Sequence, residues 1–415
     1  MTETRPPERD DGRWLPLLLI FTTLIAMAVF GSRPLISYIA LSVGAGPAEL
    51  GVIASSFAVL AIAGAIPLGR AIDRIGERPI MLLGALLCLV VCLGLPVVTS
   101  LPGLAIGHAL LGLGQMMAVV GAHTMLAHRG PAAKRAFRIG LYTSAASLGH
   151  ALGPAWVGIT IGERVTPEGS TLALIGGACA SAVAAMTIAL TRPERPRAAH
   201  AASSAEASRA SVGETLRLPG MVPALTAGVV ALTAVDLLVA YLPAYGEERS
   251  IAPQVVGFAL ATLALAQMVS RLGLGKLLDR YGHATVLVAS VLLAGLVIPA
   301  LVAPVGEPAL IAILAVAGLG LGLAQPLTLV WVAIATPPRS RGLAMGVRMG
   351  GNRLGQLLIP VAVGATAGQL GVGAIFVTVA AMLAAAAGYV VRERRMLTPE
   401  IPAGAVRRAT GPADP

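Results

Sequence analysis

The chain has 415 residues, of which 56% are hydrophobic and only 12% are charged, and its formal net charge is +10. A soluble domain would expose far more charge, so this composition excludes an ordinary soluble protein and indicates a protein embedded in a membrane. The excess of Lys and Arg is then explained by membrane topology and by contact with anionic lipid, and nucleic acid is not an expected partner.

Glycine, proline and charged residues divide the chain into twelve apolar segments of roughly 18 to 28 residues, the length that a helix needs to cross a bilayer. In chain order the predicted helices cover residues 14–40, 48–68, 79–98, 102–127, 139–161, 172–190, 221–245, 254–272, 285–302, 308–335, 343–368 and 373–391. The predicted fold class is therefore an all-α membrane protein with twelve transmembrane helices.

The basic residues predict the orientation of these helices. Nearly all of the 30 Lys and Arg residues lie in alternate loops and in the two tails, whereas the loops on the other side hold only Arg164 and Arg249. By the positive-inside rule, both termini and the long middle segment are cytoplasmic. The predicted location is the cytoplasmic membrane, either a bacterial inner membrane or a plasma membrane, crossed many times.

The second half of the chain repeats the first. A shift of 206 residues superposes Gly51 on Gly257, Pro154 on Pro360 and Gly158 on Gly364. Two like halves predict two pseudo-symmetric six-helix bundles, an arrangement in which transporters place a site at the interface between repeats. The predicted parts are a cytoplasmic tail at 1–13, a bundle at 14–190, a flexible cytoplasmic linker at 191–220, a second bundle at 221–391 and a cytoplasmic tail at 392–415.

A motif of glycines and charges follows the predicted helix at 48–68 and recurs after the helix at 254–272. Its first copy comprises Gly69, Asp73, Arg74, Gly76 and Arg78, and its second copy comprises Gly275, Asp279, Arg280 and Gly282. The motif resembles the signature of the major facilitator superfamily, a family of secondary transporters. The resemblance spans residues 14 to 391 and implies that Asp73 latches the cytoplasmic start of the helix at 343–368 in the outward-open state. The alternative is that these charges only solvate a loop.

The predicted helix at 139–161 carries a second pattern of small residues. It comprises Gly149, Gly153, Pro154 and Gly158, and it resembles the superfamily motif of exporters that exchange substrate for protons. Small residues let helices approach closely, and a proline leaves one carbonyl without its helical partner. The alternative interpretation is ordinary packing within the membrane.

Two residues are candidates for proton coupling. Asp236 is the only acidic residue in the interior of a predicted helix, and a carboxylate held away from water can bind a proton near neutral pH. His108 stands where the family commonly has an Arg, and imidazole also titrates in the physiological range. The alternatives are that Asp236 permanently neutralises Arg33 and that His108 is a satisfied packing residue.

Polar residues at mid-membrane depth form the predicted substrate site. Their orientation toward a central cavity is implied by the resemblance. These residues are Arg33, Gln115, His150, Tyr241, Gln325, Asn352, Arg353 and Gln356. The excess of Arg favours an anionic or zwitterionic substrate. Arg348 lies near the start of the predicted helix at 343–368, so its side chain can instead extend to the membrane interface.

The predicted function is secondary transport by alternating access, in the first instance proton-coupled efflux of a small drug or metabolite. Proton-linked uptake of a small organic anion is the alternative, and a non-transporting receptor on the same fold is an alternative of another class. The expected partners are a small molecule, protons and the lipid bilayer, and the expected state is a monomer. No phosphate-binding loop or metal-ligand cluster stands out, so an enzyme, a cofactor and a metal are not expected.

Overall fold

The computed structural model describes residues 13–130, 134–192, 212–337 and 340–393, and every structural statement below refers to these ranges. The first half contains α1 (Trp14–Ser42), α2 (Pro47–Ile75), α3 (Glu77–Gly94), α4 (Leu101–His128), α5 (Arg135–Ile161) and α6 (Pro167–Ala189). The second half contains α8 (Val212–Leu216), α9 (Met221–Glu248), α10 (Pro253–Leu272), α11 (Leu274–Tyr281), α12 (His283–Val297), α13 (Glu307–Ala335), α14 (Arg341–Leu370) and α15 (Gly373–Arg392). Short 3-10 helices at Leu95–Val97 and Ile298–Val302 extend α3 and α12.

The prediction of an all-helical protein with many membrane spans is confirmed. Ten helices in the described ranges are long and apolar enough to cross a membrane. They are α1, α2, α3, α4, α6, α9, α10, α12, α13 and α15. The other two predicted spans, α5 and α14, are long helices of 27 and 30 residues, but they are more polar. Their polar side chains contribute to the site described below.

The motif of glycines and charges, predicted to lie in a loop after a helix, is mostly helical in both of its copies. The motif from Gly69 to Ile75 belongs to the last turns of α2, and the turn itself is confined to Gly76, which has a φ of 86°. In the second copy, α11 occupies the equivalent positions and Gly282 makes the turn with a φ of 75°. Both angles lie in the region that favours glycine. Most of the predicted linker and both predicted tails lie outside the described ranges.

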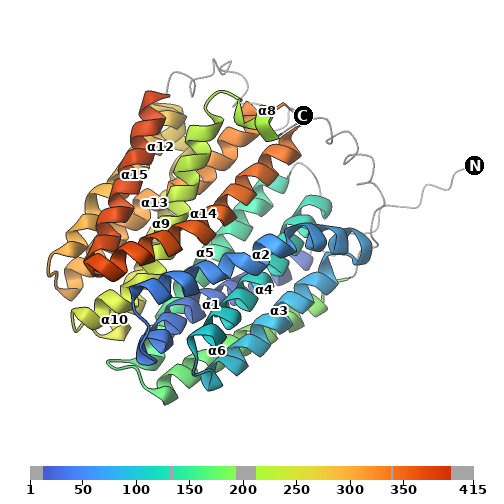
Figure 1. The fold of residues 1–415 in the computed structure, drawn as a ribbon. Helices are drawn as coiled ribbons and strands as arrows, with labels where there is room; N and C mark the ends of the chain where they lie inside the picture. Colours follow the sequence, from blue (N-terminus) through green and yellow to red (C-terminus); the bar gives the residue numbers. More distant parts are fainter. Residues whose placement is uncertain (1–12, 131–133, 193–211, 338–339, 394–415) are drawn as a thin grey trace, which may run out of the picture.

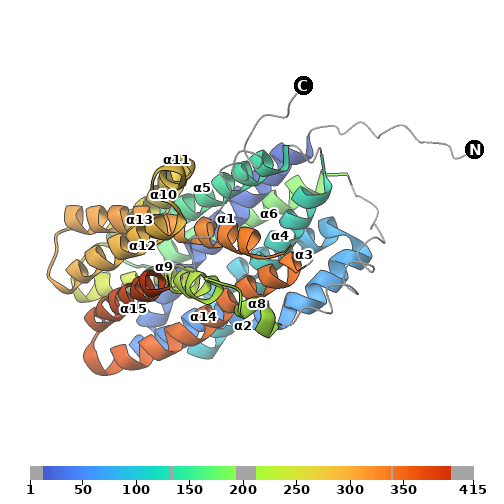
Figure 2. The same cartoon turned by 90° about the horizontal axis from the view of Figure 1, so that it is seen from above.

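The helices of the two halves lie side by side in both views (Figures 1 and 2). In the first half, α1 packs on α5 and α6, and α4 packs on α2 and α3. In the second half, α13 packs on α10 and α12, and α12 packs on α15. The halves meet where α2 contacts α14, α5 contacts α10 and α1 contacts α9. The division into two bundles at the predicted boundaries stays a prediction.

Two matching glycine contacts join the halves at one end of the molecule. A Cβ atom added to Gly51 on α2 would lie 2.4 Å from the carbonyl oxygen of Pro360 on α14. A Cβ atom added to Gly257 on α10 would lie 2.6 Å from the carbonyl oxygen of Pro154 on α5. The shift of 206 residues converts one contact into the other. We call the two contacts the seams, and the end of the molecule where they lie the sealed end.

At the opposite end, glycines of α2, α5 and α14, and of α11 that follows α10, make no such close contact. A Cβ atom added to Gly69, Gly140, Gly275 or Gly346 would meet no atom within 4 Å. Asp73, the residue of the predicted latch, is exposed in this conformation. By the positive-inside prediction the sealed end faces outward, so the latch belongs to the opposite conformation and stays a prediction.

Candidate functional site

A buried ion pair joins the two halves. Arg33 on α1 donates a hydrogen bond from Nη2 to Oδ1 of Asp236 on α9, at 2.7 Å, and the two side chains are only 4% and 6% exposed. Taking two charges out of water is costly, and removing one partner of such a pair typically costs about 3–5 kcal/mol. Loss of either partner would therefore leave an uncompensated charge buried at the contact between α1 and α9.

Two residues of α14 extend this pair. Gln356 donates from Nε2 to Oδ2 of Asp236 at 2.7 Å, and Arg353 donates from Nη1 to Oε1 of Gln356 at 2.9 Å. Residues 353 and 356 are three positions apart and therefore share a helix face. We call Arg33, Asp236, Arg353 and Gln356 the central cluster. Its residues come from both halves, so any change in its charge acts on the contact between them.

Aromatic rings surround the guanidinium group of Arg33. Its Cζ atom lies 4.7 Å from the ring centre of Phe57 and 5.3 Å from that of Phe30, which is within the range of a cation–π contact. His150 stacks on Phe30 with ring centres 3.7 Å apart. The predicted substrate residue His150 thus lies in the second layer around Arg33.

His108 is held by the backbone of α2. Its Nδ1 atom donates to the carbonyl oxygen of Ile53 at 2.6 Å, and its ring centre lies 5.0 Å from that of Phe57. This contact corresponds to the packing alternative for His108. Its part in proton coupling stays a prediction.

A second group of polar residues lies between α13 and α14. Arg348 donates from Nη2 to Oε1 of Gln325 at 2.7 Å, and Asn352 donates to the same oxygen at 3.2 Å. Gln325 itself donates to the carbonyl oxygen of Gly228 on α9 at 2.7 Å. The structure thus brings the predicted residues Gln325 and Asn352 together with Arg348, which is directed toward α13.

Two predicted substrate residues lie outside both groups. Tyr241 is fully buried, and its hydroxyl donates to the carbonyl oxygen of Pro47 at 2.8 Å. A Cβ atom added to Gly51 would lie 2.8 Å from the same hydroxyl oxygen, so Tyr241 belongs to the sealed end. Gln115 is half-buried on α4, apart from these contacts. Tyr241 and Gln115 therefore contact neither polar group, and the part of every predicted residue in substrate binding stays a prediction.

Sequence reasoning missed one residue of this interface. Arg271 stands at the end of the predicted helix at 254–272, among the basic residues expected on the cytoplasmic side, but it donates from Nη1 to Oγ of Ser147 on α5 at 2.9 Å. It also donates from Nε to the carbonyl oxygen of Gly322 on α13 at 3.1 Å. Although α10 ends at Leu272, the chain continues after Gly273 as the short helix α11, so Arg271 is not followed by an extended loop. The helical character of the motif that follows Gly273 was the signal available in the sequence.

The glycine pattern of α5 packs this helix on two neighbours. Added Cβ atoms at Gly149 and Gly153 would lie 2.3 Å and 2.5 Å from carbonyl oxygens of α1, those of Thr23 and Met27. The remaining members of the pattern, Pro154 and Gly158, form the seam with α10. The pattern therefore couples the seam directly to α1, the helix that carries Arg33.

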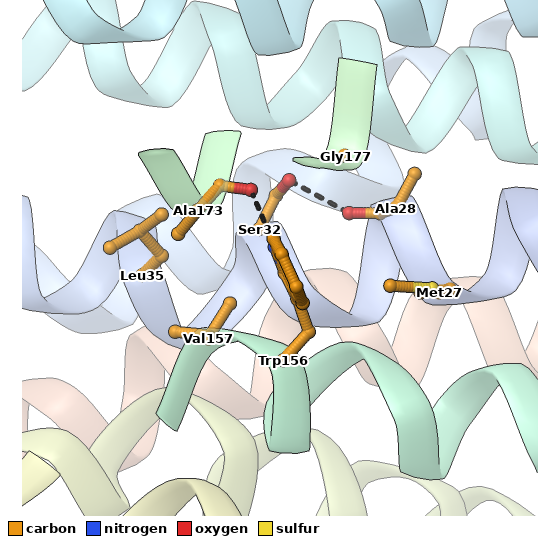
Figure 3. Close-up of a pocket in the computed structure, with 9 residues that line it drawn as sticks. Met27, Ala28, Ser32, Leu35, Trp156, Val157, Ala173 and Gly177 are labelled. Carbon is orange, nitrogen blue, oxygen red and sulfur yellow. Dashed lines mark hydrogen bonds between the residues drawn. The ribbon is translucent and has the colours of Figure 1, made fainter. Parts of the chain in front are cut away.

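One small hollow lies between α1, α5 and α6, away from the central cluster (Figure 3). Its lining is mainly apolar, and its polar groups bond to the backbone: Ser32 donates to Ala28 at 2.7 Å and Trp156 donates to Ala173 at 3.3 Å. Such a lining offers no charged group to a ligand. The hollow therefore is a packing defect within the first half, and the candidate site is the polar interface described above.

Comparisons with known proteins identify the same architecture. The sequence profile described as Major Facilitator Superfamily matches residues 18–252 and 224–412. A bacterial homologue of the human lysosomal transporter Spinster, in an inward-facing and occupied conformation, has a TM-score of 0.76 at 15% identity over 94% of this chain and 98% of that chain. A mutant of the nucleoside transporter NupG has a TM-score of 0.75 at 14% identity, over 91% of this chain and 99% of that one. A D-xylose–proton symporter has a TM-score of 0.73 at 12% identity, over 92% and 97%. At these identities the likeness shows the fold alone, and no curated protein matches the chain.

Proposed function

Because the chain belongs to the major facilitator superfamily and is a secondary transporter, we propose that it carries a small organic anion across the membrane together with a proton. The ion pair between Arg33 and Asp236 is the observation that carries this proposal. Asp236 is the proton carrier, and Arg33 is the group that the substrate anion binds.

The coupling follows from competition for one guanidinium group. While Asp236 is ionised, its carboxylate occupies Arg33, and a substrate anion must displace it. A proton on Asp236 removes that competitor, so proton and anion each favour binding of the other, and by linkage the effect is reciprocal. Cooperative binding of this kind moves the two species in the same direction.

The central cluster also connects binding to the movement of the halves. Arg33 lies on a helix of the first half, whereas Asp236 and Arg353 lie on helices of the second. Protonation of Asp236 weakens the direct ion pair between halves, and a bound anion restores an electrostatic link through itself. The electrostatic link between Arg33 and the second half is then made only in the empty deprotonated site and in the fully loaded site, which suits a carrier that must not move with proton alone.

A flux measurement tests this proposal. In proteoliposomes that contain the purified protein, an inward proton gradient is expected to concentrate a radiolabelled small carboxylate inside, and a protonophore is expected to abolish that accumulation. Liposomes without protein serve as the control. The proposal would be contradicted if accumulation did not depend on the proton gradient for any carboxylate that the protein transports.

Proton-coupled export is a second candidate function, and the packing of α5 favours it. Gly149 and Gly153 contact the backbone of α1, while Gly158 contacts that of α10, as expected for a helix that transmits movement between a seam and the site. In an exporter, proton and substrate compete rather than cooperate. Substrate loaded inside the same proteoliposomes would then leave against its gradient as protons enter, and raising the proton concentration would weaken substrate binding.

Replacing Arg353 with Gln is expected to weaken binding of an anionic substrate about tenfold or more, because a hydrogen bond to a charged group is worth about 1.5–3 kcal/mol. Binding of a neutral analogue of the same size should change little. Calorimetric titration of both ligands measures the difference, and Arg164→Gln, which removes a charge from an exposed loop position, is the matched control. Equal weakening of both ligands by Arg353→Gln would assign this residue a purely structural role.

A further inference from the structure

We infer that the transported anion carries two negative charges, and that Arg271 is one of the residues that bind it. The inference rests on the proposed function, since it names the substrate class of the same site. It depends on the charges at the interface between the halves and on the helix faces that present them.

The interface holds more positive charge than negative charge. Arg33 is paired with Asp236, but Arg353 donates only to the neutral amide of Gln356. Arg271 donates only to a hydroxyl group and to a backbone carbonyl. Within the described ranges, Asp236 is the one carboxylate that contacts any of these three guanidinium groups. Uncompensated charges at membrane depth are costly and usually face a partner or a ligand.

The helix faces bring Arg271 to the same place as the central cluster. Arg271 bonds to Ser147, and His150 lies three positions further along α5, on the same face. His150 stacks on Phe30, the ring that Arg33 also contacts. Arg271 and Phe30, the ring that Arg33 contacts, therefore lie against neighbouring positions on one face of α5.

The internal repeat gives these faces a simple relation. The shift of 206 residues superposes Ser147 on Arg353 and His150 on Gln356. The face of α5 that receives Arg271 is thus the counterpart of the face of α14 that contacts Asp236. A ligand between the two faces would meet Arg271 on one side and Arg353 on the other, with Arg33 between them.

One atom of Arg33 also lacks a partner. Its Nε is buried and makes no hydrogen bond within the described residues, and the residue as a whole is only 5% exposed. Buried donors are nearly always satisfied, so an unsatisfied one beside surplus positive charge indicates a position for an acceptor. With Asp236 protonated, the three guanidinium groups would carry three positive charges, and a dianion compensates two of them.

Binding to purified protein, in the absence of any gradient, tests the inference. The probes are malonate, succinate and glutarate, with the monoamide succinamate and the diamide succinamide as partners of matched size, all at equal ionic strength. The best dicarboxylate is expected to bind about tenfold or more tightly than succinamate, because one charge-assisted contact is lost in the monoamide. Arg271→Gln should reduce that preference to about twofold or less.

Three further variants separate binding from folding. Ser147→Ala removes one of the two hydrogen bonds of Arg271 but keeps the charge, so the dicarboxylate preference should persist. Arg271→Lys should retain most of the preference, and Lys276→Gln, which removes an exposed charge nearby, should leave it unchanged. Calorimetry gives the affinities, and a thermal unfolding scan confirms that each variant is folded.

The possible outcomes are distinct. Equal affinity for dicarboxylate and monoamide, failure of all three dicarboxylates to bind, or an unchanged preference in Arg271→Gln would each overturn the inference. Because no gradient is involved, a dianion preference without proton-driven flux would support this inference while refuting the proposed coupling. Proton-driven flux of monocarboxylates alone would support the proposed coupling while refuting this inference.

Discussion

Proteoliposomes that contain Asp236→Asn protein are expected to exchange substrate across the membrane but not to concentrate it when a proton gradient is imposed. Asn has nearly the same shape as Asp and can still accept a hydrogen bond from Arg33, so the packing between α1 and α9 should persist. It cannot gain or lose a proton, so substrate binding no longer depends on protonation at this position. Accumulation should fall to the level set by simple equilibration.

Exchange of labelled for unlabelled substrate, measured without a gradient, shows whether the Asp236→Asn carrier still moves. Glu307→Gln, which removes an exposed carboxylate at the start of α13, is the control and should behave as the unmodified protein does. If Asp236→Asn protein concentrates substrate with unchanged pH dependence, then Asp236 is only the structural partner of Arg33.

Gly51→Ala is expected to open the sealed end. The added methyl carbon would lie 2.4 Å from the carbonyl oxygen of Pro360, and both groups belong to backbones that cannot move away separately. Overpacking of this kind typically costs about 1–3 kcal/mol, which changes a ratio of two conformations roughly 5- to 150-fold. The population should shift toward a conformation in which α2 and α14 are separated.

Distances between spin labels placed across the sealed end measure that shift in the Gly51→Ala protein. Gly257→Ala should act in the same direction, because the internal repeat places it at the second seam. Gly69→Ala lies on the same helix as Gly51 but meets no atom within 4 Å, so it should leave the distances unchanged. Equal shifts in all three variants, or none in the two seam variants, would show that the seams do not hold this end closed.

The fold could be predicted from the sequence because its determinants are local or repeated. Apolar length defines membrane helices, and the shift of 206 residues indicates two like halves without any knowledge of contacts. The pair formed by Arg33 and Asp236 was also within reach, since a single acid inside the membrane has few possible partners. Apolar length is a weaker signal for α5 and α14, which are long but more polar than the other helices. Their polar side chains belong to the candidate site.

Other parts of the site depend on packing that the sequence does not state. Tyr241 lies on the same helix as Asp236, but its hydroxyl reaches the start of α2 because Gly51 leaves room for it. Arg271 lies at the end of α10, in agreement with the predicted helix at 254–272, but the sequence does not show that its side chain reaches Ser147 on α5. In both cases the direction of the side chain is decided by a neighbouring helix that is distant in sequence.

The two copies of the repeat differ in an instructive way. The backbone contacts at the seams occur in both copies, yet the polar residues between them differ: Ser147 corresponds to Arg353, and His150 corresponds to Gln356. Under the proposed function, closure of the sealed end and selection of the cargo therefore belong to separate positions along the same helices. A protein built in this way can acquire a new specificity through a few side chains while its moving parts stay intact, which makes α14 the natural place to redesign what it carries.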